Sequence, residues 1–98
     1  MAKKLSSAEI FEELKKNKNW ALIENKLYQK MVFKNFISAF SFMTHIALHA
    51  ERLNHHPEWK NVYTQIEIWL TTHDAKGISK KDFELASIID QFAHLENK

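Results

Sequence analysis

The spacing of hydrophobic and polar positions changes several times along this chain, and each change predicts a new element. Ser6 and Glu9 have the spacing of a capping box, and a short apolar stripe follows them, which predicts a helix over about residues 7–17. Two runs rich in aromatic and β-branched residues, 20–23 and 27–33, flank a short polar stretch. These runs predict an antiparallel β-hairpin.

From Asn35 the apolar positions recur at helical spacing, which predicts a long helix with Asn35 as its cap. Its buried face is predicted to carry the following residues: Phe36, Ala39, Phe40, Met43, Ile46, Ala47, Ala50 and Leu53. Ile37 and Leu48 fall on the opposite side, among polar residues that include Ser38. That side is either a subunit interface or a surface with ordinary exposed aliphatic side chains.

The second half of the chain predicts another pair of strands and a last helix. Pro57 pushes the residue before it toward extended backbone, so the long helix should give way to a strand there. Alternating side chains predict strands over 59–63 and 65–72, while Gly77 supplies a turn and Ser79 can cap the final helix. The buried stripe of that helix is predicted to be Leu85, Ile88, Ile89, Phe92 and Leu95. The order α-β-β-α-β-β-α predicts an α+β fold, a four-stranded antiparallel sheet with helices packed on one face.

The composition is that of one small globular domain covering residues 1–98. Hydrophobic residues make up 45% of the chain, and a single glycine and a single proline leave little material for long loops. A core of this size is only marginally able to stand alone, so association of copies would help it. The chain has no cysteine, which excludes disulfides and thiol catalysis. We expect a cytoplasmic protein, or a nuclear one in a eukaryote, without membrane contact, because no signal-peptide core and no apolar run of about 20 residues is present.

The charge pattern argues against nucleic-acid binding. Fourteen basic residues stand against twelve acidic ones, and the formal net charge is +2. The lysine pairs are scattered, and Arg52 is the sole arginine, whereas a nucleic-acid interface usually concentrates basic side chains and uses arginine for bidentate contacts. We therefore expect no direct nucleic-acid partner.

Three histidines in two short segments are the candidate chemical groups. His55 and His56 directly precede Pro57, and His73 stands at the predicted end of a strand, four residues before Gly77. Imidazoles titrate near neutral pH and can exchange protons with a substrate. From the residues alone, a structural role is the alternative, with imidazoles that hydrogen-bond a corner and a strand end.

A metal site is a weaker interpretation of the histidines. His45 and His49 lie four residues apart on one predicted helix, as two zinc ligands often do. No acidic residue follows His45 as the metalloprotease motif requires, and the adjacent His55 and His56 should point apart in a bending segment. We expect no metal site, and we expect His94 to be a surface residue.

The two histidine segments together resemble one enzyme family. The run His55-His56-Pro57-Glu58-Trp59, followed by Thr72-His73-Asp74 and Gly77-Ile78-Ser79, resembles the pterin-4a-carbinolamine dehydratases, also called 4a-hydroxytetrahydrobiopterin dehydratases. The resemblance extends to Glu51 and Asp82 and covers most of the chain. It implies the fold predicted above and a lyase that removes water from 4a-hydroxytetrahydropterin to give quinonoid dihydropterin. Such an enzyme needs no cofactor, and it recycles tetrahydrobiopterin for aromatic amino-acid hydroxylases.

The resemblance also implies the site residues. Pterin contacts are expected from His55, His56, Pro57, Thr72, His73, Asp74 and Ala75. We expect His55 and His73 to transfer protons, on opposite faces of the pterin, and His56 mainly to bind and orient the substrate. Three supporting candidates each have an alternative role. Glu51 could act on a neighbouring imidazole or accept a pterin hydrogen bond, or it could be a solvated helix residue. Trp59 could wall the pocket or belong to the core, and Asp82 could support the site, cap a helix or do both.

Assembly is part of the same expectation. The dehydratases form dimers by joining sheet edges and tetramers by packing helices, and Ile37, Leu48 and Trp69 stand on otherwise polar faces of this chain. We therefore expect a homo-oligomer, a dimer or more specifically a tetramer. The alternative function is that of a non-catalytic oligomerisation cofactor or transcriptional coactivator, because animal relatives assist a homeodomain transcription factor. The sequence identifies no such partner.

Overall fold

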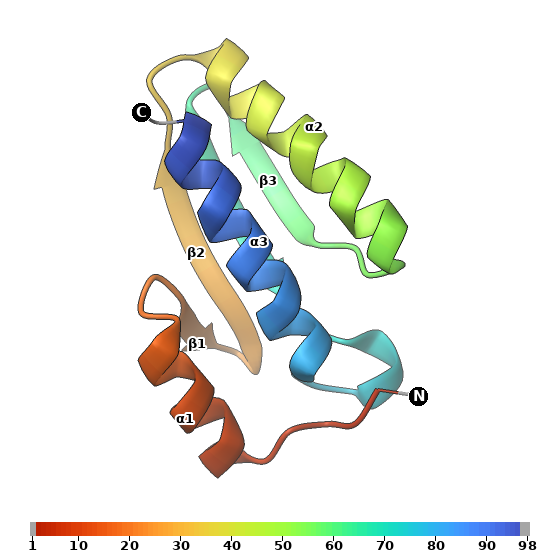
Figure 1. Cartoon of the computed structure of the whole chain (residues 1–98). Coiled ribbons are helices and arrows are strands. Elements are labelled where there is room, and N and C mark those ends of the chain that lie inside the picture. The colour runs from red at the N-terminus through yellow and green to blue at the C-terminus, as the bar shows by residue number, and fades with distance from the viewer. Residues whose placement is uncertain (1, 97–98) are drawn as a thin grey trace.

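The computed structural model describes residues 2–96 and confirms the predicted order of elements. The elements are α1 (Ser7–Lys16), β1 (Ala21–Ile23), β2 (Lys26–Val32), α2 (Phe36–Leu53), β3 (Glu58–Val62), β4 (Gln65–Leu70), the short 3-10 helix η1 (His73–Ala75) and α3 (Lys80–Glu96). Ser6 and Glu9 form the predicted capping box at α1, and the Asn35 side chain accepts a hydrogen bond from the backbone N–H of Ser38 at the start of α2. The predicted α+β fold is confirmed (Figure 1).

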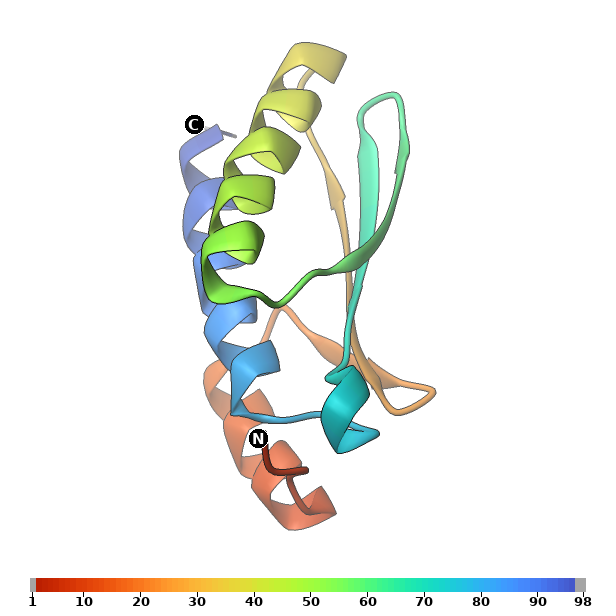
Figure 2. The ribbon, with the colours of Figure 1, turned by 90° about the vertical axis from the view of Figure 1, so that its right-hand side faces the viewer.

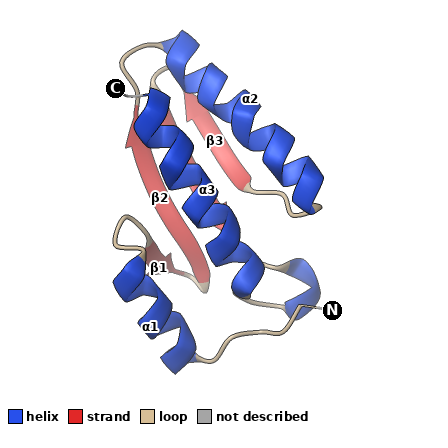
Figure 3. Cartoon of the chain, viewed as in Figure 1, coloured by secondary structure: helices blue, strands red, loops and turns tan. Residues whose placement is uncertain are grey.

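The four strands form one antiparallel sheet in the order β1-β2-β4-β3. The long central pairing joins β2 to β4 and runs from Leu27 opposite Leu70 to Val32 opposite Gln65. All three α-helices lie on one side of this sheet, and its other face has no helix over it (Figures 2 and 3). Hydrogen bonds to Asp82 of α3 from His55, just after α2, and from Thr72, just after β4, bring the end of α2, the end of β4 and the start of α3 close together.

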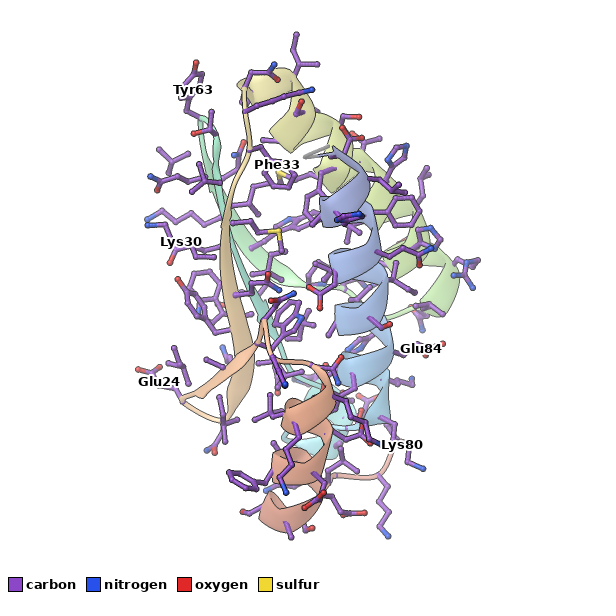
Figure 4. The ribbon with its side chains drawn as sticks, turned by 60° about the vertical axis from the view of Figure 1, so that its left-hand side comes forward. Glu24, Lys30, Phe33, Tyr63, Lys80 and Glu84 are labelled. Atoms are coloured by element: carbon purple, nitrogen blue, oxygen red, sulfur yellow. The ribbon has the colours of Figure 1, made fainter. Side chains whose placement is uncertain are left out.

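The core lies between the sheet and the helices. Alternation along β4 sends Ile66, Ile68 and Leu70 to the helix side, where they are fully buried. In Figure 4 the Phe33 side chain points into this layer and Lys30 points away from it on the opposite face. The Phe33 ring lies 5.0 Å from the ring of Phe42, which α2 contributes. The helices are thus held to the sheet by buried aliphatic and aromatic contacts.

One predicted strand is too long. Strand β4 ends at Leu70, whereas the alternation predicted a strand to Thr72. Beyond Leu70 the chain turns through η1, and Thr72 pairs only with Gly77 in an isolated antiparallel bridge. Lys76, rather than Gly77, has the left-handed backbone in this turn, with φ of 56°. Thr72 has an extended backbone and a buried side chain in this bridge, and the alternating pattern therefore extends to Thr72 although the strand does not.

The buried faces of the helices differ in part from those predicted. On α2, Phe36 and Phe40 are exposed and contact each other, while Ser38 and Phe42 are buried. On α3, the predicted Leu95 is exposed, and Phe83 and Ala86 are buried instead. Ala47 of α2 is likewise exposed. The physical reason is that α2 carries more apolar residues than the sheet and α3 can cover.

The surplus apolar side chains of α2 remain on the surface. Ile37 is 79% exposed and Leu48 is 66% exposed. Despite this apolar content, the helices among residues 2–96 lack the combination of length and hydropathy that crossing a membrane requires.

Candidate active site

The first histidine segment is shaped by the end of α2. Asn54 has a left-handed backbone, with φ of 51° and ψ of 44°, a conformation that asparagine tolerates better than most residues. The backbone N–H of His55 then donates to the carbonyl of Ala50 at 3.0 Å, so the chain reverses sharply before Pro57 leads into β3. This turn separates the two imidazoles, because His55 is buried at 8% exposure while the His56 side chain is 57% exposed.

The second segment reaches the same end of the molecule from β4. The bridge between Thr72 and Gly77 closes a short loop that contains η1, with the backbone N–H of Thr72 donating to the Gly77 carbonyl at 2.9 Å. The His73 side chain in this loop is fully exposed. Its Nδ1 atom lies 3.7 Å from Oδ1 of Asp74, a distance that leaves the ring loosely held. This imidazole can therefore turn to meet a ligand.

A cavity of about 270 Å³ lies where the two segments meet the start of α3. Its lining consists of Asn54, His55, His56, Thr71, Thr72, His73, Asp74 and Lys81. The volume is near the lower end of the range for small-molecule pockets, and polar side chains dominate the lining. All three candidate histidines thus face one small polar cavity.

A larger cavity elsewhere lacks this chemistry. It measures about 450 Å³ and lies between the N-terminal segment and the start of α3, beside Leu5 and Glu9. Its lining consists of Ala2, Lys3, Leu5, Glu9, Ser79, Lys80 and Lys81 and contains no imidazole. Residue chemistry therefore favours the smaller cavity as the candidate active site, although it is not the largest.

The His55 ring is held by a buried carboxylate. Nε2 of His55 lies 2.6 Å from Oδ1 of Asp82, whose side chain is fully buried on the first turn of α3. The other carboxylate oxygen, Oδ2, accepts from the Thr72 hydroxyl at 2.7 Å and from the Ser79 backbone N–H at 2.9 Å. Asp82 therefore both caps α3 and orients His55, which joins the two roles that the sequence left as alternatives.

Glu51 contacts His56 rather than His55. Its Oε1 atom lies 2.7 Å from Nε2 of His56, and both side chains are largely exposed. The one-turn spacing from Glu51 to His55 does not bring these two together, because the helix ends at Leu53 before reaching His55. An exposed pair of this kind orients the His56 ring but contributes little to stability.

The other predicted site residues are distributed around the cavity. Pro57 and Ala75 are half-buried neighbours of the lining residues. Trp59 is half-buried and packs against the hydrophobic core, in line with its core alternative. The hydroxyl of Thr72 is engaged with Asp82 and Ser79, so this residue faces the cavity with its polar atom already hydrogen-bonded.

Three lining residues, Asn54, Thr71 and Lys81, were not among the predicted site residues. Lys81 stands in the first turn of α3, one residue before Asp82, and Thr71 directly follows β4. The spacing of Ser79 and Asp82, typical of a capped helix start, was the signal that could have located this turn beside the histidines. A basic side chain at that place had no distinguishing pattern among the scattered lysines.

The histidines of α2 lie away from this cavity. His45 and His49 both pack beside the ring of Phe92, and Nδ1 of His49 lies 2.9 Å from an Arg52 guanidinium nitrogen. Among residues 2–96, no three side chains of the metal-binding types gather closely enough to hold an ion. His94 is exposed on α3, as predicted.

Comparison with known proteins identifies the family. Residues 3–92 match the family model described as pterin 4 alpha carbinolamine dehydratase, which covers most of the chain. The chain belongs to the pterin-4α-carbinolamine dehydratase family. The resemblance read from the two histidine segments is thereby confirmed.

Relatives of this dehydratase family match the chain over nearly its whole length. A protein of Solibacter usitatus, provisionally named a pterin-4-alpha-carbinolamine dehydratase, is 50% identical over 93 residues, which are 95% of this chain and 98% of the relative. A protein of Sinorhizobium fredii with the same provisional name is 48% identical over 92% of this chain and 88% of its own length. The crystal structure of a transcriptional coactivator/pterin dehydratase from Brucella melitensis superposes with a TM-score of 0.90 at 34% identity, covering 92% of this chain and 98% of that one.

Proposed function

We propose that this protein removes water from 4a-hydroxytetrahydropterin, the 4a-carbinolamine, to give quinonoid dihydropterin. The observation that carries the proposal is the cavity of about 270 Å³ on which His55, His56 and His73 converge, in a chain of the dehydratase family. The reaction would regenerate the pterin cofactor that aromatic amino-acid hydroxylases consume. For this reaction the protein needs only to bind the substrate and to transfer protons.

The chemistry needs one acid and one base. The C4a–O bond breaks as the leaving hydroxyl accepts a proton, and a ring nitrogen gives up a proton as the new double bond forms. One proton enters the departing water and one leaves the pterin, so the reaction is balanced without any redox partner. Imidazole is suited to both transfers because it can donate or accept near neutral pH.

His55 and His73 are the proposed proton-transfer residues, serving opposite faces of the pterin. The His55 ring is rigid, because its Nε2 atom is hydrogen-bonded to Oδ1 of Asp82 at 2.6 Å and the side chain is almost wholly buried. His73 is exposed and loosely held, which allows it to close over a bound ligand. The carboxylate beside His55 balances the positive charge that its ring carries after accepting a proton.

His56 is proposed to bind and orient the substrate. Its ring lies on the cavity and is bonded to Glu51 at 2.7 Å, so one nitrogen is fixed by the carboxylate and the other is available to a ligand. Asp74 and the backbone around Pro57 and Ala75 are proposed to complete the pterin contacts. We further propose that the chain works as a homo-oligomer, a dimer or tetramer, with the exposed apolar side of α2 in its interface.

A direct test is stopped-flow absorbance with freshly generated 4a-hydroxytetrahydropterin. His55→Ala and His73→Ala should each lower kcat by about 10²–10⁴-fold, the range that positioned acids and bases contribute. His56→Ala should mainly raise KM. His94→Ala is the matched control, because this exposed histidine lies outside the cavity and its loss should change neither constant. Unchanged kcat in both proton-transfer variants would refute the assignment.

A second candidate function is favoured by one observation, the exposed apolar side chains of α2. Ile37 is 79%, Leu48 66% and Phe40 55% exposed, which suits a binding surface. The Brucella melitensis relative is named a coactivator as well as a pterin dehydratase. A purely binding role would survive loss of His55 and His73, so the same variants separate the two functions.

A further inference from the structure

We propose that Ser79 and Thr72 are positioning residues that fix the tautomer of His55 through a directed chain of buried hydrogen bonds. The proposal deepens the proposed function and rests on it for the role of His55 in proton transfer. It assigns to two hydroxyl groups a task that neither helix capping nor pterin contact includes. Both hydroxyls belong to buried residues, with Thr72 at 4% and Ser79 at 1% exposure.

The direction of each bond follows from what its atoms can do. The Asp82 carboxylate can only accept hydrogen bonds, so the Thr72 hydroxyl donates its single hydrogen to Oδ2 of Asp82 at 2.7 Å. In the contact of 2.6 Å between the two hydroxyls, Thr72 must therefore accept and Ser79 must donate. The Ser79 oxygen in turn accepts from the backbone N–H of Lys81 at 3.2 Å. The chain thus runs from Ser79 through Thr72 to Asp82.

The restrained Asp82 carboxylate in turn holds the His55 ring. Three donors converge on its carboxylate, two on Oδ2 and one on Oδ1, so the group has little freedom to rotate. The donor on Oδ1 is Nε2 of His55, which must carry a hydrogen at a separation of 2.6 Å. The other tautomer would set two acceptors against each other in a buried place, a costly arrangement.

The remaining ring nitrogen of His55 is left for the substrate. Within residues 2–96, Nδ1 of His55 has no hydrogen-bond partner. Every buried side-chain nitrogen or oxygen of these residues has a partner, so Nδ1 is not one of the buried atoms. Nδ1 is therefore accessible to solvent, and the cavity that His55 lines is where that access opens. With the hydrogen fixed on Nε2, the neutral ring presents a lone pair on Nδ1 that can take a proton from the pterin. The four side chains act as one unit, in which Ser79 and Thr72 never touch the substrate's reacting atoms.

Two single substitutions in the whole protein test this series of hydrogen bonds. Thr72→Val keeps the shape of the side chain and removes its hydroxyl, while Ser79→Ala removes only the first donor. Nitrogen NMR of the His55 ring, assigned by comparison with His55→Gln, reports which nitrogen carries the hydrogen and needs no substrate. Intact protein should show a hydrogen on Nε2 alone. In both variants the Asp82 carboxylate is less restrained and can turn away from Nε2, so they should show a mixture of tautomers. The kcat should fall about tenfold in Thr72→Val, which removes a hydrogen bond to a charged group, and about two- to tenfold in Ser79→Ala, which removes one between neutral hydroxyls. KM should change by less than about twofold in both variants.

Matched controls separate positioning from stability. Asn35→Ala removes the N-cap of α2, at the opposite end of that helix from His55, and so gives a comparable capping loss away from the cavity. Thr64→Val makes the same exchange as Thr72→Val at a half-buried position outside the site. Neither control should alter the His55 ring signals or kcat. Thr72→Ser, which keeps the hydroxyl, should restore both.

The outcomes are distinct for this proposal and for the proposed function. A hydrogen on Nδ1 of neutral His55 in intact protein would overturn the proposal whatever the activity. Ring signals unchanged in both folded variants would overturn it as well. Absence of dehydration by intact protein would instead overturn the proposed function, because the ring signals are read without substrate. A tautomer mixture together with the loss of kcat, both reversed by Thr72→Ser, would support the proposal.

Discussion

Replacement of Asp82 by asparagine is the perturbation that most sharply divides its two roles. The side chain is fully buried and accepts hydrogen bonds from His55, Thr72 and the backbone of Ser79. Asparagine has nearly the same shape but only one accepting oxygen. If that oxygen keeps the two partners of Oδ2, the amide NH₂ faces Nε2 of His55. The ring must then move its hydrogen to Nδ1, and the lone pair offered to the substrate is lost.

The expected magnitudes follow from these contacts. A hydrogen bond to a charged group contributes about 1.5–3 kcal/mol and one between neutral groups about 0.5–1.5 kcal/mol. Weakening three bonds of Asp82 by about 1 kcal/mol each should lower the free energy of unfolding by about 2–4 kcal/mol. A domain of this size has about 5–15 kcal/mol in total, so Asp82→Asn should still fold. Its kcat should fall about 10²–10⁴-fold, because a mis-set histidine loses its acid–base role.

Urea unfolding at fixed protein concentration and stopped-flow dehydration measure the two effects separately. The unfolding midpoint should fall by about 1–2 M for a slope of about 2 kcal/mol per molar urea. Asp90→Asn is the matched control on the same helix, since Asp90 accepts from Trp20 and Gln29 outside the cavity. That control should lose stability but keep kcat. If Asp82→Asn also kept kcat within about twofold, Asp82 would be a helix cap only, and the orienting role would be refuted.

Three further predictions concern the rest of the molecule. The hydrogen bond from the backbone N–H of Ser6 holds the pKa of the Glu9 carboxyl below its ordinary value. The ionised Glu9 carboxylate therefore contributes its full stabilisation above the unfolded-state pKa, and this stabilisation is lost as pH falls through the lower folded-state pKa. An NMR titration of Glu9 checks the direction of the shift. Phe42→Ala should lower the free energy of unfolding by about 3–5 kcal/mol in urea, because Phe42 is fully buried. Ile37→Glu should weaken self-association in sedimentation velocity, because this exposed residue lies on the proposed interface.

Each of these predictions has a result that would count against it. In Ser6→Pro, which lacks the backbone N–H, Glu9 should titrate closer to its ordinary pKa, and an unchanged titration would exclude this hydrogen bond as the cause. Phe40→Ala is the control for the core substitution, since Phe40 is 55% exposed, and an equal loss from both would contradict the burial argument. Identical sedimentation of the Ile37→Glu variant and the intact protein would exclude this side of α2 from the interface.

The sequence predicted the order of elements because the signals for each are local. The capping box of Ser6 and Glu9, the cap at Asn35 and the alternation along β4 act within a few residues. The faces of α2 were harder to predict, because helical spacing alone does not say which of two apolar sides meets the sheet. Phe42 was therefore missed in the buried stripe, and Phe40 was wrongly included.

The site shows the same division between local and distant information. The segments containing His55 and His73 were recognisable as sequence motifs, and the structure brings both to one cavity. The bond from His55 to Asp82 spans 27 residues and depends on how α3 packs, which spacing alone does not reveal. The pairing of Glu51 depends on the left-handed residue that ends α2, because a helix continued by one turn would have brought Glu51 beside His55 instead of His56.

The central claim is that the cavity between the two histidine segments dehydrates 4a-hydroxytetrahydropterin. The most direct test is the rate of water loss measured by stopped-flow absorbance for intact protein, for the His55→Ala, His73→Ala double variant and for the uncatalysed reaction. Circular dichroism should establish that both proteins are folded. We predict rapid dehydration by the intact protein and a rate near background for the double variant. No acceleration by folded intact protein, or full acceleration by the double variant, would contradict the account.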